Sequence, residues 1–166
     1  MRKRALVLMA ALWVVGCDGQ HGTHNQAASP VGASSHATAE SGQGLAYLAS
    51  LVGQHPNHID LWATEPLNAR LHALLGMQYR SFIDNMEVQG PLAAYDGVVW
   101  ASGNRAHRGG VDAAVLLVDT RTDKLEVYLL TDHRLWHHAE REPRIALKGD
   151  AKSTVDQLRE AAEQPR

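Results

Sequence analysis

The chain has 166 residues, a length typical of a single domain, and its 45% apolar and 20% charged residues are ordinary for a soluble globular protein. The net charge of −2 leaves no surplus of basic residues to bind a nucleic-acid backbone, so we expect no nucleic-acid partner. The single cysteine excludes an internal disulfide framework and a cysteine-based zinc cluster, and the 10 histidines are the one unusual feature of the composition.

The first 16 residues have the layout of a lipoprotein signal peptide. A basic start, residues 2–4, precedes the apolar run 5–15, which is too short for a membrane-spanning helix. The run leads into Val14-Val15-Gly16-Cys17, which resembles a bacterial lipobox, where the cysteine is lipidated and becomes the first residue of the mature chain. A buried free Cys17 after a plain signal peptide is the weaker alternative, because the only cysteine falls at the lipobox position.

Lipidation of Cys17, with fatty acids such as palmitate, predicts a protein that is anchored in the bacterial cell envelope and faces the periplasm. Asp18 directly follows Cys17 and resembles an inner-membrane retention signal. Loss of the three basic residues of the signal takes the net charge from −2 to −5. Residues 17–44 contain mostly small and polar residues, and we expect them to form a lipidated flexible tether.

Helices are predicted for the first part of the folded domain, which we place at residues 45–147. Apolar residues recur at helical spacing in three successive segments, so that each segment has one apolar face. These segments are residues 45–52, residues 67–75 before Gly76, and residues 79–86.

Strands are predicted after Met86, where the apolar pattern changes. A weak strand over 88–95, broken by Gly90-Pro91, is followed by Asp96-Gly97, which is a hairpin turn signal. The segment 111–119 is apolar on both of its faces, as in a central strand that is covered on both sides. Further strands are expected over 98–102, 124–130 and 134–138.

This order of elements predicts an α+β fold, with N-terminal helices packed on an antiparallel sheet of about five strands. Residues 148–166 are expected to form a polar tail. The helical spacing of Val155, Leu158 and Ala162 within it allows a short surface helix.

The loop between Ser102 and Val111 is longer than a tight hairpin needs. Its residues 103–110 include two arginines and a histidine but no acid, so the loop is a local positive feature on an acidic mature chain. A protruding basic loop on a rigid sheet is suited to entering an acidic cleft.

The segments around this loop resemble the Ivy family, the bacterial inhibitors of vertebrate (c-type) lysozyme. The resemblance covers most of residues 45–140. It implies a protein that is not an enzyme, that needs no cofactor, and that has c-type lysozyme as its protein partner. The motifs that carry it are Leu71-His72-Ala73-Leu74-Leu75-Gly76, Val88-Gln89-Gly90-Pro91, Asp96-Gly97, Trp100-Ala101-Ser102-Gly103 and Asp112-Ala113-Ala114.

Family loops typically have the sequence Cys-Lys-Pro-His-Asp-Cys. The same six positions in this chain are Asn104, Arg105, Ala106, His107, Arg108 and Gly109. The resemblance implies that His107 reaches the two catalytic carboxylates of lysozyme, with Arg105 as its basic neighbour and Arg108 as added positive charge. Both cysteines are replaced, so the family's disulfide clamp is absent and the loop has more entropy to lose on docking. Either other contacts hold the loop, or inhibition is weak or lost.

Two other functions stay open on the sequence alone. The first alternative is that His107 is a solvated loop histidine. The chain would then be an envelope binding protein of the same fold without lysozyme inhibition. Weak metal binding by histidines is the other alternative, although no set has a third and fourth ligand at recognisable spacing, so we predict no defined metal site. The histidines in question are His21, His24, His55, His58, His137 and His138.

The sequence contains no motif that indicates an enzyme. The chain lacks the motifs of serine hydrolases, zinc proteases and phosphate-binding loops. Three acidic residues near predicted strand ends, Asp112, Asp119 and Asp123, are interpreted as strand-edge and turn residues.

Overall fold

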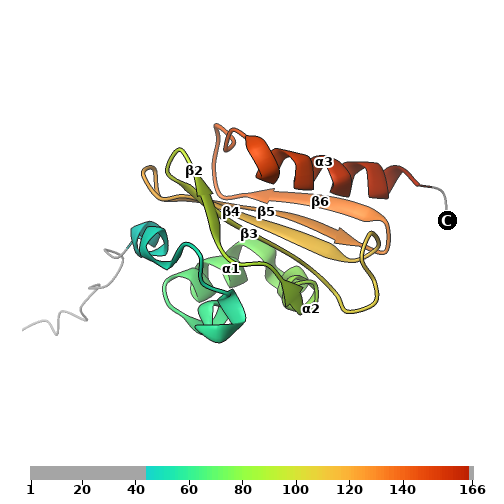
Figure 1. Ribbon diagram of the computed structural model, residues 1–166, viewed down its shortest axis with the longest axis horizontal. Coiled ribbons are helices and arrows are strands. Elements are labelled where there is room, and N and C mark those ends of the chain that lie inside the picture. Colours follow the sequence, from blue (N-terminus) through green and yellow to red (C-terminus); the bar gives the residue numbers. More distant parts are fainter. Residues whose placement is uncertain (1–43, 165–166) are drawn as a thin grey trace, which may run out of the picture. The chain divides into compact units, whose positions relative to one another are not determined.

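The computed structural model describes residues 44–164, in which helices cover both faces of an antiparallel sheet (Figure 1). The predicted signal peptide and the predicted tether up to residue 43 lie outside the described residues. Within residues 44–164, no helix has both the length and the apolar character needed to cross a membrane.

The sheet has six strands in the order β1-β3-β4-β5-β6, and β2 pairs with β3 as well. All neighbouring strands are antiparallel. The predicted turn at Asp96-Gly97 is confirmed, since it joins β2 to β3 with a positive φ at both residues, as a two-residue hairpin requires. The strands are β1 (Val88–Gln89), β2 (Ala93–Tyr95), β3 (Val98–Asn104), β4 (Ala113–Asp119), β5 (Lys124–Thr131) and β6 (Arg134–Ala139).

The helices that precede the sheet in sequence cover one of its faces. The buried side chains of Leu67, Leu71 and Leu75 recur every fourth residue along α1, and they share a core with Phe82 of α2 and with the sheet. The elements on this side are η1 (Leu45–Leu51), η2 (Pro56–His58), η3 (Leu61–Ala63), α1 (Leu67–Leu75), η4 (Gly76–Gln78) and α2 (Tyr79–Asp84), where η denotes a 3-10 helix.

The opposite face of the sheet is covered by α3 (Gly149–Glu163), as Figure 1 shows. Val155 is fully buried in α3, and it belongs to the same core as Val115, Leu117 and Leu130 of the sheet. Successive side chains of β4 therefore pack alternately into two separate cores, one under each helical layer.

The predicted arrangement of N-terminal helices on a sheet of about five strands is wrong, although the protein is α+β. The sheet has six strands, because the weak strand expected over 88–95 is two short strands on either side of Gly90-Pro91. The longest helix comes last in the chain, in the segment expected to be a polar tail. Charged residues on its outer side make the segment polar on average, although one face of the helix is buried. That face is formed by Ala151, Val155, Leu158 and Ala161.

A buried carboxylate holds the connection from β6 to α3 against the sheet. Glu126 of β5 is fully buried, and it accepts hydrogen bonds from the Ile145 backbone N–H at 2.5 Å and from His137 Nε2 at 2.9 Å. The ammonium group of Lys124 lies 3.9 Å from the same carboxylate. Because a buried charge is costly without such partners, this network fixes the path that brings α3 over the sheet.

Val155→Ala tests whether α3 is part of the core. Removing the two methyl groups should lower the free energy of unfolding by about 1–3 kcal/mol, because the side chain is fully buried. Urea denaturation measures the change. Glu160→Ala on the exposed side of the same helix is the control, with an expected change within about 0.5 kcal/mol. Equal effects of the two substitutions would contradict a core role for α3.

Candidate functional site

The loop 103–110 begins with the last two residues of β3 and leads toward β4, at the end of the sheet where β5 also turns into β6 (Figure 1). It consists of two successive turns. The N–H of Arg108 donates to the carbonyl of Arg105 at 3.0 Å, and the N–H groups of Val111 and Asp112 donate to the carbonyl of Arg108, each at 3.0 Å. The N–H of Arg105 donates to the carbonyl of Asp112 at 3.1 Å and closes the loop at its base. The loop thus has a defined backbone conformation.

His107 occupies the third position of the first turn, with a φ of 60°. A positive φ at this position is typical of a type II turn, and histidine tolerates it better than most side chains do. The residue is exposed, and its ring has no hydrogen bond or ion pair within residues 44–164. The imidazole is therefore presented to solvent, with its hydrogen-bonding capacity unused.

The two arginines of the loop differ in their surroundings. Arg108 forms a close ion pair through its Nε with Asp112, and its terminal nitrogen lies 3.9 Å from Asp132. Arg105 is exposed and has no ion pair in the described part of the chain. Most of the unneutralised positive charge of the loop therefore lies at Arg105, next to the first turn.

Asn104 and Gly109, which replace the two cysteines of the family pattern, face each other across the base of the loop. A Cβ atom built on Gly109 would lie 3.8 Å from Nδ2 of Asn104. The Asn104 amide instead donates a hydrogen bond to the carbonyl of Arg105 at 2.9 Å. The structure thus places the Asn104 side chain beside position 109, with an amide where the family pattern has a cysteine.

Residues at the end of α2 support the strands that carry the loop. The buried Asn85 amide donates to the carbonyls of Ala113 in β4, at 3.1 Å, and Leu130 in β5, at 2.7 Å. A Cβ atom on Gly103 would lie 2.9 Å from the carbonyl oxygen of Asn85, so only glycine allows this close approach. The base of the loop is therefore packed tightly against the α2 side.

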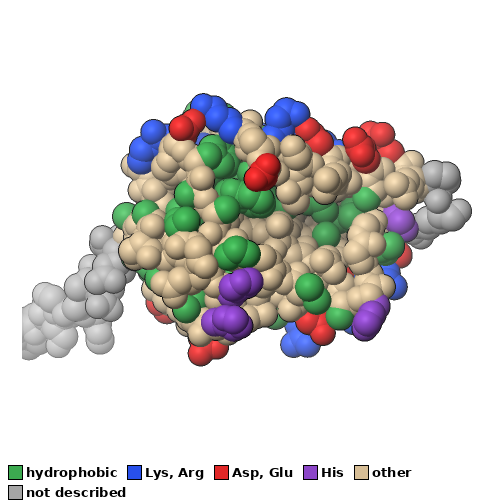
Figure 2. Space-filling model, viewed as in Figure 1, with side chains coloured by type: hydrophobic (Ala, Val, Ile, Leu, Met, Phe, Trp, Pro, Cys, Tyr) green, Lys and Arg blue, Asp and Glu red, His purple; other side chains and the backbone are tan. Residues whose placement is uncertain are grey.

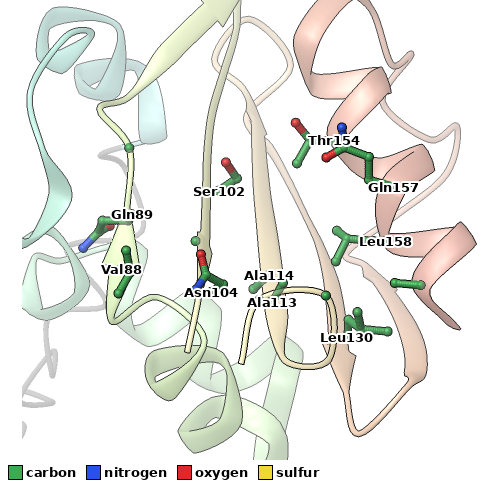
Figure 3. A pocket seen from close by; sticks show the side chains of 15 residues that line it. Val88, Gln89, Ser102, Asn104, Ala113, Ala114, Leu130, Thr154, Gln157 and Leu158 are labelled. Atoms are coloured by element: carbon green, nitrogen blue, oxygen red, sulfur yellow. The ribbon is translucent and has the colours of Figure 1, made fainter. Parts of the chain in front are cut away.

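A cavity of about 480 Å³ lies beside the loop, between β3 and α3. Figure 3 shows Ser102 of β3 and Gln157 of α3 pointing toward one another across it, while Gln89 points away. Its lining contains no charged or histidine side chain. Figure 2 likewise shows the charged side chains gathered along the α3 edge of this face, with few over its centre. The cavity offers no group for acid–base catalysis.

The described histidines outside the loop do not assemble into a metal centre. The rings of His55 and His58 are 5.2 Å apart, but within residues 44–164 no three His, Cys, Asp or Glu side chains are placed to hold a metal ion. His137 binds Glu126, and burial together with the neighbouring His137 lowers the pKa of His138. His21 and His24 lie outside the described residues.

Two adjacent glycines of the loop provide a matched test of its conformation. Gly110 has a φ of 82°, whereas Gly109 lies outside the positive-φ region and has room for a Cβ atom. Gly110→Ala should therefore cost about 1–2 kcal/mol of stability, while Gly109→Ala should be neutral or slightly stabilising. Thermal unfolding of both variants measures this difference. If Gly109→Ala is the more damaging, the loop has a different backbone.

A protein-family model matches this chain. The family model described as "Inhibitor of vertebrate lysozyme (Ivy)" matches residues 66–161, which span α1 to the last buried residue of α3 and include the whole loop. Neither the curated proteins nor the solved structures compared with this chain give a match. Because the matched region covers more than half of the chain, the protein belongs to the Ivy family of vertebrate lysozyme inhibitors.

Proposed function

We propose that this protein inhibits c-type lysozyme by inserting the loop 103–110 into the active-site cleft of the enzyme. The family match supports a lysozyme partner and an inhibitory role rather than a catalytic one. The observation that carries the proposal is the position of His107. Its imidazole is exposed, unpaired within the described residues, and held at a turn of defined conformation.

The chemistry of the partner fits such a side chain. A c-type lysozyme uses two carboxyl groups, one that acts as a general acid and one that is ionised. An imidazole can donate a hydrogen bond to a carboxylate from either ring nitrogen, and from both when it is protonated. Placed between the two groups, His107 would satisfy them and exclude the substrate. Arg105 adds a positive charge that attracts the acidic cleft during approach.

The N-terminal motif suggests where the inhibitor acts. We propose that Cys17 is lipidated and that residues 17–44 tether the domain to a membrane of the cell envelope, facing the periplasm. Asp18 supports the inner membrane as the site of anchoring. The inhibitor would then lie between an invading lysozyme and the membrane, next to the peptidoglycan.

His107→Asn tests the inhibitory role of the imidazole. Asparagine tolerates a positive φ, so the turn is kept while the ring is lost. Losing this contact in a desolvated cleft should weaken inhibition of c-type lysozyme by about 2–5 kcal/mol, mainly through faster dissociation.

Arg105→Ala should mainly slow association and reduce its dependence on salt. A lysis assay and binding kinetics with the purified domain measure these effects.

Two exposed residues away from the loop serve as controls for these substitutions. His55→Asn, directly before η2, and Arg121→Ala in the turn between β4 and β5 should leave inhibition unchanged. If the unsubstituted domain does not inhibit c-type lysozyme at micromolar concentration, the protein is an envelope binding protein of the same fold. If His107→Asn inhibits as well as the unsubstituted domain, the loop is not the inhibitory element.

Cys17→Ser tests the lipid anchor. Without the thiol there is no site for the acyl chains, so the protein should accumulate as an unprocessed precursor or a soluble exported form. Membrane fractionation and mass spectrometry of the N-terminus distinguish these forms from the lipidated protein. Unchanged membrane association of a variant that has lost its signal would contradict the anchor.

A further inference from the structure

We infer that Glu87 and Asp112 form a noncovalent clamp that holds the loop 103–110 in its binding conformation, in the place of the disulfide of the family pattern. The effect on lysozyme binding rests on the proposed function. The clamp itself rests on contacts within this chain, and it is tested without lysozyme. Neither acid touches the partner in this proposal, so both are positioning residues.

Asp112 connects the loop to the neighbouring turn of the sheet. Its side chain is only 5% exposed, and each carboxylate oxygen has its own partner. Oδ2 receives the Arg108 guanidinium, while Oδ1 accepts a hydrogen bond from the N–H of Asp132 at 2.8 Å. Asp132 belongs to the turn between β5 and β6. Because the carboxylate is buried and fully hydrogen-bonded, this ion pair is worth more than one on the open surface.

Glu87 holds the loop from the other side. It lies just before β1, where Val88 pairs with Asn104, so the chain leaving α2 runs beside the start of the loop. Its Oε2 accepts a hydrogen bond from the N–H of Ala106 at 3.1 Å. The hydrogen bond that closes the first turn joins Arg105 and Arg108, so this N–H is free to bind Glu87. Glu87 thereby restrains the residue directly before His107.

The two acids act on the residues that a disulfide would enclose. A bridge between positions 104 and 109 would close a ring around residues 105–108, and the clamp restrains Ala106 and Arg108 within that ring. Arg108 stands where the family pattern has an acid, and the change gives Asp112 a cationic partner four residues away. Ordering these residues before binding lowers the entropy lost on docking.

Amide hydrogen exchange of residues 105–112 tests the clamp in the isolated domain. Glu87→Ala should speed exchange of the Ala106 N–H roughly tenfold, and Asp112→Asn should do the same for the amides of the second turn. Asp84→Ala is the control, since it removes an exposed ion pair with Arg80 on the same side of the molecule. Because Glu87 is exposed, its substitution should leave the fold intact and keep the test valid if Asp112→Asn unfolds.

Rescue by a covalent bridge gives a readout that a general loss of stability would not produce. Asn104→Cys together with Gly109→Cys, added to Glu87→Ala, should restore slow exchange when oxidised and lose it again on reduction. Lysozyme inhibition should fall and recover in parallel.

Exchange that is unchanged in Glu87→Ala, or equally changed in Asp84→Ala, overturns the clamp. A bridge that restores slow exchange but not a lost inhibition overturns the role of the clamp in binding, because the acids would then not position the loop for lysozyme. If the unsubstituted domain does not inhibit lysozyme, the proposed function fails, while the exchange results still decide whether the clamp exists.

Discussion

Strands β4 and β5 are buried on both faces, and the other elements are arranged to remove these two faces from water. Val115 and Leu117 face one core, and Leu116 and Val118 face the other. The helices before the sheet can cover only one side, so the chain must pass the edge of β6 and return as α3. Glu126 holds that return path. The rigid sheet between the two layers gives the loop 103–110 a fixed base.

Much of this arrangement could be predicted from local patterns. The stripe of Leu67, Leu71 and Leu75 indicated α1, and Asp96-Gly97 indicated the first hairpin. The two-sided apolar pattern of β4 also predicted that other elements cover both faces of the sheet. The helix that covers the second face, α3, was not predicted as part of the core. It is charged on its outer side, and two of its four buried residues are alanines. The weak strand split in two for an equally local reason, the Gly90-Pro91 break.

The candidate site was predictable in part. The motif identified the six loop residues, but two residues that hold the loop were missed. Asp112 was interpreted as a strand-edge residue, because its ion pair with Arg108 depends on the turns of the loop between them. Glu87 could not be found from local sequence, because its contact with Ala106 depends on the register of β1 against β3. Such contacts between distant segments are set by tertiary packing.

Because positions 104 and 109 hold an amide and a glycine instead of two cysteines, the conformation of this loop does not depend on redox conditions. A disulfide forms only after oxidation, and it is broken by reductants. Residues 44–164 contain no cysteine, so this loop needs no oxidising enzyme and becomes ordered as soon as the sheet is formed. Its order then depends on ionic contacts, which salt screens. The domain can therefore be produced in a reducing cytoplasm with its loop in the native conformation.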